Sequence, residues 1–240
     1  MDQLVQGRRI ELARCLKDLE NRAQKENSWL FSLNSFRNES AAAQNIKEFY
    51  GKRRKNNLAK FEAAHRKRIE KLRIISSRFS VEDGGLKSET RVKDKLKKQK
   101  KRQSEAAREG KEKRPLSITD FSRIRIICPQ LQDFESVYTQ MMNEWGLGCV
   151  GRYNYYLDAT PNADTPFRGL TTNWVHYELP PLDISTEVQI VTSRVRSLLD
   201  LNHAFDVART AEYPNSGLRS WVHRLLYKAS ILDLQELLGE

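Results

Sequence analysis

Helical and strand-like hydrophobic patterns divide this chain into two unequal parts. From Asp2 to about Phe79, apolar residues recur near the 3.6-residue period while lysine and arginine occupy the other positions, which predicts helices. The glycines of VEDGGLKSET, residues 81–90, then interrupt the chain and predict a turn. Helical patterns return at residues 132–145 and from Ser193 onward.

Strand-like patterns lie between these helical segments. Ile124, Ile126 and Cys128 share one parity, and Arg123 and Arg125 share the other, so this segment predicts a strand with one buried face. Three further strands are expected at residues 152–157, 170–179 and 184–191. Alternating helices and strands, flanked by helices at both ends, predict an α/β or α+β fold with a mixed sheet of about five strands.

The strand STEVQIVT places two polar side chains together. Glu187 and Gln189 share the face opposite Val188 and Ile190, and Val191 breaks the alternation. One interpretation is that Glu187 and Gln189 face solvent at a sheet edge. The alternative is that this polar face meets the arginines of the 123–128 strand, because a carboxylate and an amide are costly to bury without partners.

The second interpretation brings two carboxylates, Asp120 and Glu187, close to Arg123 and Arg125. Carboxylate oxygens hold Mg²⁺, and guanidinium groups bind phosphate oxygens in pairs. The sequence contains neither a GxxxxGK[ST] loop nor a kinase-type glycine loop, so side chains must bind the phosphate groups of any polyphosphate ligand.

Composition points the same way. Lys and Arg number 42 against 31 Asp and Glu, a formal net charge of +11, which favours polyanionic partners such as nucleic acid, nucleoside polyphosphates or an anionic membrane surface. The three cysteines are widely spaced, which argues against a zinc site or a disulfide framework. With no signal-peptide pattern or membrane-spanning apolar run, a cytoplasmic location is expected.

In sequence order, the motifs resemble the synthetase domain of RelA/SpoT proteins over about residues 59–207. The similar segments are RVK (91–93), a lysine-rich helix, ITDFSRIRII (118–127), PFRGL (166–170) and TEVQIVT (186–192), followed by His203. The resemblance implies a nucleotidyltransferase-like mixed sheet. It also implies an ATP-dependent pyrophosphokinase that moves pyrophosphate onto the 3′-hydroxyl of GDP or GTP. We therefore expect an N-terminal helical region at 1–80, a synthetase core at 81–210 and a C-terminal helix at 211–240.

The resemblance also assigns roles to residues. Asp120 and Glu187 are implied as the catalytic and Mg²⁺-binding carboxylates, Glu187 as a metal ligand or as the base on the acceptor hydroxyl. The expected ATP-phosphate ligands are Arg91, Lys93, Lys100, Lys101, Arg123 and Arg125, and the expected acceptor ligands are Phe167, Arg168, Gln189 and His203.

Several positions depart from the family pattern. Arg123 stands where the D-x-x-G-x-R motif has glycine, Thr171 where a histidine is usual, and Val191 where an arginine is usual. Phe167 stands where a tyrosine usually stacks on the acceptor guanine. Because these positions belong to the acceptor side, the expected alternatives are another purine nucleotide or the 3′ end of tRNA as acceptor, or a non-catalytic nucleotide- or RNA-binding module. The terminal helices are expected to pack against the sheet or to mediate self-association into a homo-oligomer.

Overall fold

The fold is seen in a computed structural model, which describes residues 2–26, 29–37, 54–75, 78–110, 120–145, 148–156, 169–175, 185–210 and 216–240. Some side chains within these ranges, including those of residues 202–210 and 216–220, lie outside the description.

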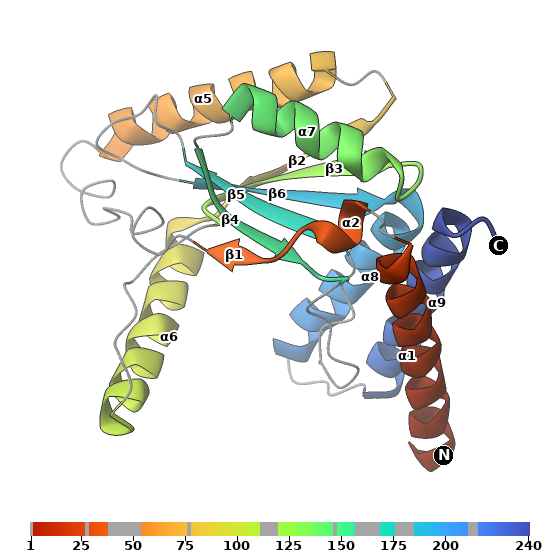
Figure 1. Cartoon of the computed structure of the whole chain (residues 1–240). Helices are drawn as coiled ribbons and strands as arrows, with labels where there is room; N and C mark the ends of the chain where they lie inside the picture. The colour runs from red at the N-terminus through yellow and green to blue at the C-terminus, as the bar shows by residue number, and fades with distance from the viewer. Residues whose placement is uncertain are drawn as a thin grey trace.

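One mixed sheet organises the molecule (Figure 1). Its strands run in the order β1-β4-β5-β6-β3-β2; β3 and β6 are parallel and every other neighbouring pair is antiparallel. The strand bounds are β1 Phe36–Arg37, β2 Ser80–Leu86, β3 Ser122–Cys128, β4 Cys149–Asn154, β5 Leu170–Val175 and β6 Ser185–Thr192. The predicted mixed sheet of about five strands is confirmed, with the two-residue β1 added at its edge.

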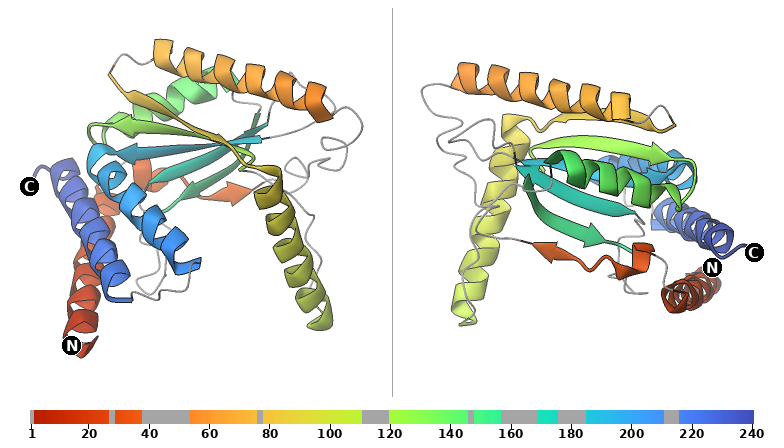
Figure 2. Two further views of the ribbon diagram at one scale, coloured as in Figure 1. Left: turned by 180° about the vertical axis from the view of Figure 1, so that it is seen from behind. Right: turned by 45° about the horizontal axis from the view of Figure 1, so that its top comes forward.

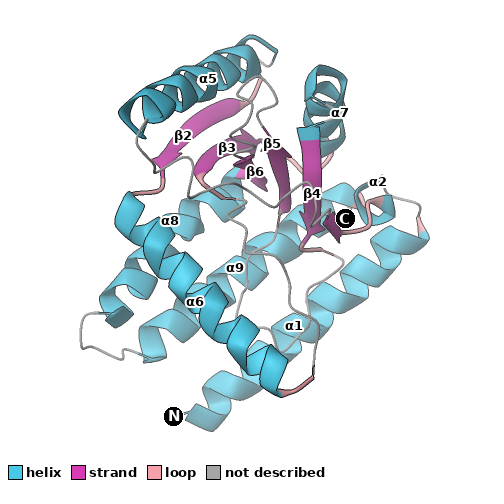
Figure 3. Cartoon of the chain, turned by 90° about the vertical axis from the view of Figure 1, so that its left-hand side faces the viewer, coloured by secondary structure: helices cyan, strands magenta, loops and turns pink. Residues whose placement is uncertain are grey.

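Helices cover both faces of this sheet. The bounds are α1 Asp2–Lys25, α2 Trp29–Ser32, α5 Arg54–Ile75, α6 Glu89–Arg108, α7 Asp133–Trp145, α8 Ser193–Thr210 and α9 Ser216–Leu237. Helices α5 and α7 lie on one side of the strands, and α8, α9 and α1 lie on the other (Figure 3). Helix α6 starts beside the end of β2 and extends away from the rest of the molecule (Figure 2). None of the helices in the described ranges is long and apolar enough to cross a membrane.

The prediction of a turn at residues 81–90 was wrong, because residues 80–86 form the edge strand β2. Val81 pairs with Ile126 and Glu82 with Arg125, and the register shifts between Asp83 and Leu86. Two consecutive glycines within a strand are unusual unless a bulge uses them, and Gly85 adopts φ +72° there. An edge strand with one buried apolar residue carries too little pattern to be recognised from sequence.

The two faces of β3 and β6 differ in character. Ile124, Ile126, Val188 and Ile190 are at most 1% exposed and belong to the main core, together with residues of α1, α5, α7 and α9. This is the buried face that the alternation predicted.

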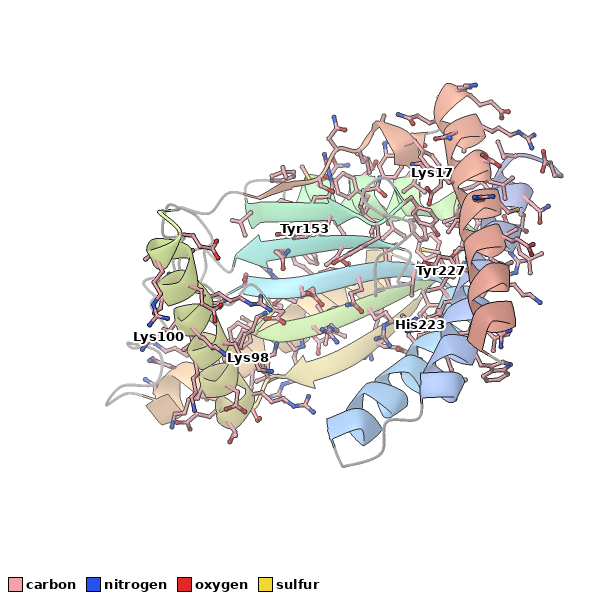
Figure 4. The ribbon with its side chains drawn as sticks, turned by 90° about the horizontal axis from the view of Figure 1, so that it is seen from below. Lys17, Lys98, Lys100, Tyr153, His223 and Tyr227 are labelled. Atoms are coloured by element: carbon pink, nitrogen blue, oxygen red, sulfur yellow. The ribbon has the colours of Figure 1, made fainter. Side chains whose placement is uncertain are left out.

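The opposite face is polar at one end and apolar at the other. The register pairs Arg123 with Glu187, Arg125 with Gln189, and residue 127 with residue 191. Ile127 and Val191 join a second apolar cluster with residues of α8 and α9, including Val195, Val222 and Leu226. Val191 breaks the polar alternation because α8 and α9 cover the sheet at that point, so the polar half of this face lies between α6 and α8 (Figure 4).

Candidate active site

A partly buried carboxylate lies just before β3. The side chain of Asp120 is 13% exposed, and its two oxygens accept hydrogen bonds from Lys87 Nζ and Lys95 Nζ, each at 2.5 Å. Burial works against ionisation, but the charges and hydrogen bonds of Lys95 and Lys87 outweigh it, so the pKa of Asp120 lies below its ordinary value. For Lys87 burial dominates, and its pKa is lowered despite the partner carboxylate. Asp120 is therefore an ionised carboxylate held between two ammonium groups.

Helix α6 explains why Lys95 reaches Asp120. Ser88 caps the helix, its Oγ accepting from Arg91 N, and Lys95 points toward the sheet. Three residues on, Lys98 lies on the same helical face, whereas Lys100 lies on nearly the opposite one (Figure 4). Helical phase therefore decides which of these closely spaced lysines contacts Asp120.

Among the described residues, the lysines and the arginine of α6 that the resemblance selected are not the cations that contact Asp120. Lys93 pairs with Glu89 at 2.7 Å and Lys101 with Glu105 at 3.9 Å, so each ion pair lies within the helix. The side chains of these two lysines are more than two-thirds exposed. Arg91 and Lys100 are exposed. Lys87 and Lys95, which the sequence did not single out, are the cations that contact Asp120.

The second carboxylate lies next to Arg123 on the neighbouring strand. Glu187 Oε1 accepts from Arg123 Nε at 2.8 Å and from Gln189 Nε2 at 2.9 Å. The Glu187 side chain is 15% exposed, against 40% for Arg123. Glu187 and Gln189 therefore face the arginines of β3 rather than bulk solvent at a sheet edge.

Arg125 continues the series toward α8. It donates to Gln189 Oε1 at 3.4 Å and to Glu82 Oε2 at 3.3 Å. Arg196 on α8 donates to the same Glu82 oxygen at 2.7 Å and pairs with Asp200 at 2.5 Å. Burial and then the charge of Arg196 lower the pKa of Arg125. Arg125 and Arg196 thus share the carboxylates of Glu82 and Asp200.

Together these groups form a row across the polar half of the sheet, from α6 to α8, with Arg123 within electrostatic reach of Lys87. We call it the charged row: Lys87, Lys95, Asp120, Arg123, Glu187, Arg125, Gln189, Glu82, Arg196 and Asp200. Glu82 was missed because its segment was interpreted as a turn. Arg196 and Asp200 have the i,i+4 spacing of a helical ion pair, which marks a pair but not its proximity to Arg125.

Solved structures with the same fold are known. The crystal structure of small alarmone synthetase 2 from Bacillus subtilis superposes with a TM-score of 0.55, 20% identity, and coverage of 78% of this chain and 97% of that chain.

The chain has the fold of the small alarmone synthetases.

Two other structures agree. Small alarmone synthetase 1 from B. subtilis bound to its product pppGpp gives a TM-score of 0.52 at 18% identity, covering 77% of this chain and 97% of that one. A GTP pyrophosphokinase family protein from Streptococcus pneumoniae gives 0.50 at 15% identity, covering 81% and 91%. No protein-family model and no curated protein matches the sequence. The resemblance to RelA/SpoT synthetase domains is confirmed at the level of the fold.

Three of the positions that depart from the alarmone-synthetase pattern lie within the described residues. Val191 lies in the apolar cluster under α8 and α9, where an arginine would be buried. Thr171 on β5 pairs with Gln189 on β6 and is 4% exposed. Arg123 faces the bare backbone of Gly84 on β2. These settings fit the residues that this chain carries.

Three expected acceptor ligands receive no structural test. Phe167 and Arg168 lie outside the described residues, and the His203 side chain, on α8, lies outside the description too. Gln189, the fourth, lies within the charged row beside Glu187.

The alarmone-synthetase fold raises the question of a divalent cation. Among the described residues, no group of three or more histidine, cysteine, aspartate or glutamate side chains is placed to hold one. Asp120 and Glu187 offer the right oxygen atoms, but Lys87, Lys95 and Arg123 already neutralise them. These side chains fit Mg²⁺ only in its common coordination in enzymes, in which one or two carboxylates bind the ion and substrate phosphates and water supply the other ligands.

Proposed function

We propose that this protein is an ATP-dependent pyrophosphokinase that transfers pyrophosphate from ATP to the 3′-hydroxyl of a guanine nucleotide, GDP or GTP. The observation that carries the proposal is the charged row, where cations and two partly buried carboxylates, Asp120 and Glu187, alternate along one face of an alarmone-synthetase sheet. The neighbouring structures bound to pppGpp and to AMPCPP support a nucleotide-binding site on this fold.

The reaction assigns one task to the α6 end of the row and another to Glu187. The acceptor 3′-oxygen attacks the β-phosphorus of ATP, the bond from that phosphorus to the α,β-bridging oxygen breaks, and AMP leaves with the bonding electrons. The acceptor's proton passes to the Glu187 carboxylate. Since phosphoryl-type transfer depends mainly on positioning and charge neutralisation, the remaining residues bind and orient the two nucleotides.

The ATP phosphates would occupy the α6 end of the row. Lys87 and Lys95 form ion pairs with Asp120 at this end, and 18% and 36% of their side chains are exposed, so phosphate oxygens can reach them. Asp120 would hold the Mg²⁺ that arrives with ATP, while Lys87 and Lys95 would turn from Asp120 to the phosphates. The ion would neutralise negative charge that develops during transfer. Glu187, beside the acceptor, would position the hydroxyl.

Radiolabel transfer tests this proposal directly. Purified protein is incubated with γ-³²P-ATP, Mg²⁺ and one acceptor at a time: GDP, GTP, AMP or tRNA. Label on GDP or GTP, lost with EDTA and restored by added Mg²⁺, is the expected result. Label on AMP or tRNA instead would redirect the acceptor assignment while keeping the chemistry. No transfer to any acceptor by a protein that still binds nucleotide would reject the enzymatic proposal.

A further inference from the structure

Arg123 presents most of its hydrogen-bonding capacity outward. The guanidinium bonds to Glu187 through Nε, and within the part of the chain that the structure describes its two terminal amino groups donate to no other side chain. These groups carry four of the five guanidinium N–H donors, in the planar geometry that matches phosphate. With 40% of the side chain exposed, they can reach a ligand.

The position of Arg123 lies between the two halves of the charged row. Its charge helps to lower the pKa of Lys87 on one side and that of Arg125 on the other, so both lie within its electrostatic reach. Across the sheet it stands directly opposite Glu187 in the register of β3 and β6. A group that moves from the Asp120 end toward Glu187 therefore passes Arg123.

Gly84 makes this placement possible. A Cβ at position 84 would lie 3.0 Å from Arg123 Cβ and 3.1 Å from its Cγ, tighter than most such contacts, so the Arg123 stem would have to shift by a few tenths of an ångström. The bulge that contains Gly84 is held by Asp83, whose Oδ1 accepts from Gly85 N at 2.7 Å and meets His65 Nε2 at 3.0 Å. The stem of Arg123 thus packs on bare backbone in a segment that is itself fixed.

We propose that Arg123 binds the pyrophosphate group in transit and at the same time positions Glu187. Its Nε holds the carboxylate, and its terminal amino groups bind oxygens of the transferred group, so one side chain links the base to the phosphorus under attack. This role rests on the proposed function only for its catalytic half. The ligand class is a phosphate oxyanion.

Binding of inorganic pyrophosphate tests the proposal without turnover. Isothermal titration calorimetry compares the wild type with Arg123→Gln, Arg123→Lys and a matched control, Arg22→Gln. Arg22 lies on α1 and pairs with the C-terminal Glu240, so its loss removes the same charge away from the row. Arg123→Gln is expected to weaken pyrophosphate binding about tenfold or more, because a charged hydrogen-bond donor is lost. Arg123→Lys should fall between, and the control should match the wild type.

Kinetics separate this role from a structural one. Arg123→Gln is expected to lower kcat by on the order of 100-fold and to raise KM for ATP by a smaller factor, because the contact to the pyrophosphate group strengthens as that group leaves ATP. Gly84→Ala, which displaces the Arg123 stem, should lower kcat in the same direction by less. Wild-type pyrophosphate affinity and kcat in Arg123→Gln would overturn the inference. If pyrophosphate binding depends on Arg123 but no acceptor is labelled by the wild type, the proposed function fails and the phosphate site stands.

Discussion

At the scale of single residues, the site is defined by which cation meets which carboxylate. Asp120 lies between Lys87 and Lys95, and Glu187 lies beside Arg123. In the free protein these pairs balance charges that would otherwise be costly to hold in a partly buried place. A polyphosphate can replace the carboxylates as partner of these cations without leaving them unpaired.

The ionisation of Asp120 gives a prediction for stability. Its pKa is lowered in the folded protein, so the stabilisation is fully present above its unfolded value, near 3.8, and is lost as the pH falls through the lower folded value. Asp120→Asn should lower the free energy of unfolding at pH 7 by about 1–3 kcal/mol, because Lys87 and Lys95 lose a charged acceptor.

Urea denaturation at several pH values checks this prediction. The difference between wild type and Asp120→Asn should shrink below about pH 3.8. Asp18→Asn, at an exposed position on α1, serves as control and should stay within about 0.5 kcal/mol of the wild type. A difference that is unchanged with pH would show that the lysine pairs do not carry the effect.

The sequence predicted residue contacts only where two patterns met. Alternation predicted a polar face for each of the 123–128 and 185–192 strands, and one of the two interpretations left open let these faces meet. The β3–β6 register places Arg123 beside Glu187 and Arg125 beside Gln189, as that interpretation requires. The choice of Lys95 over its neighbours depends on the phase of α6 relative to the sheet, which no local pattern contains. The Glu82 contact depends on a bulged edge strand whose glycines resemble a turn.

At the scale of elements, the end of β6 decides where the charged row stops. Thr192 Oγ1 donates to Asp233 Oδ2 on α9 at 2.5 Å and accepts from Val195 N at 3.2 Å, so it joins the strand, the start of α8 and α9. Asp233 is 1% exposed, and its burial raises its pKa even though Thr192 and Arg194 oppose that shift. This junction fixes the helices that cover Ile127 and Val191.

Replacement of Thr192 tests that junction. Thr192→Val keeps the shape but removes the hydroxyl that serves both the buried carboxylate and the helix cap, so unfolding should become easier by about 1–3 kcal/mol. Chemical denaturation monitored by circular dichroism measures it. Ser197→Ala, which removes an exposed hydroxyl bonded to Ser193 O on the same helix, should change stability far less. Equal effects of the two substitutions would contradict the assigned role.

At the scale of the whole molecule, the terminal helices belong to the same core as the sheet. Helix α1 packs along α9, and Leu16, Leu19 and Leu234 join the main core cluster with the strands. Arg22 on α1 pairs with Glu240 at the end of the chain. The observed contacts agree with the expectation that these helices pack against the sheet. Self-association and the domain boundaries at residues 80 and 210 stay predictions.

Two leucines on α9 test how much the terminal helix contributes. Leu234 is fully buried and Leu232 is 52% exposed, two residues apart on the same helix. Leu234→Ala should cost about 2–5 kcal/mol because it leaves a cavity in the main core, whereas Leu232→Ala should stay within about 0.5 kcal/mol. Thermal and urea unfolding measure both. A tolerant Leu234→Ala would mean that α9 is only an appendage.

The fold of the whole molecule was more predictable than its substrate. Periodicity and motif order indicated a mixed sheet with flanking helices, and solved structures at 15–20% identity share it. We expect acceptor choice to depend on positions where this chain differs from the family pattern, such as Arg123, Thr171 and Val191. Their settings follow from packing between segments distant in sequence, such as β2 against β3 and α9 against the end of β6.

The measurement that tests the central claim most directly is the rate of label transfer from γ-³²P-ATP to GDP or GTP by Glu187→Gln. Its control is Glu144→Gln, an exposed glutamate on α7 that pairs with Lys71. Because Glu187 is assigned as the group that takes the acceptor proton, its loss should slow transfer by about 10²- to 10⁴-fold, while the control keeps the wild-type rate. Wild-type transfer by Glu187→Gln would contradict the account.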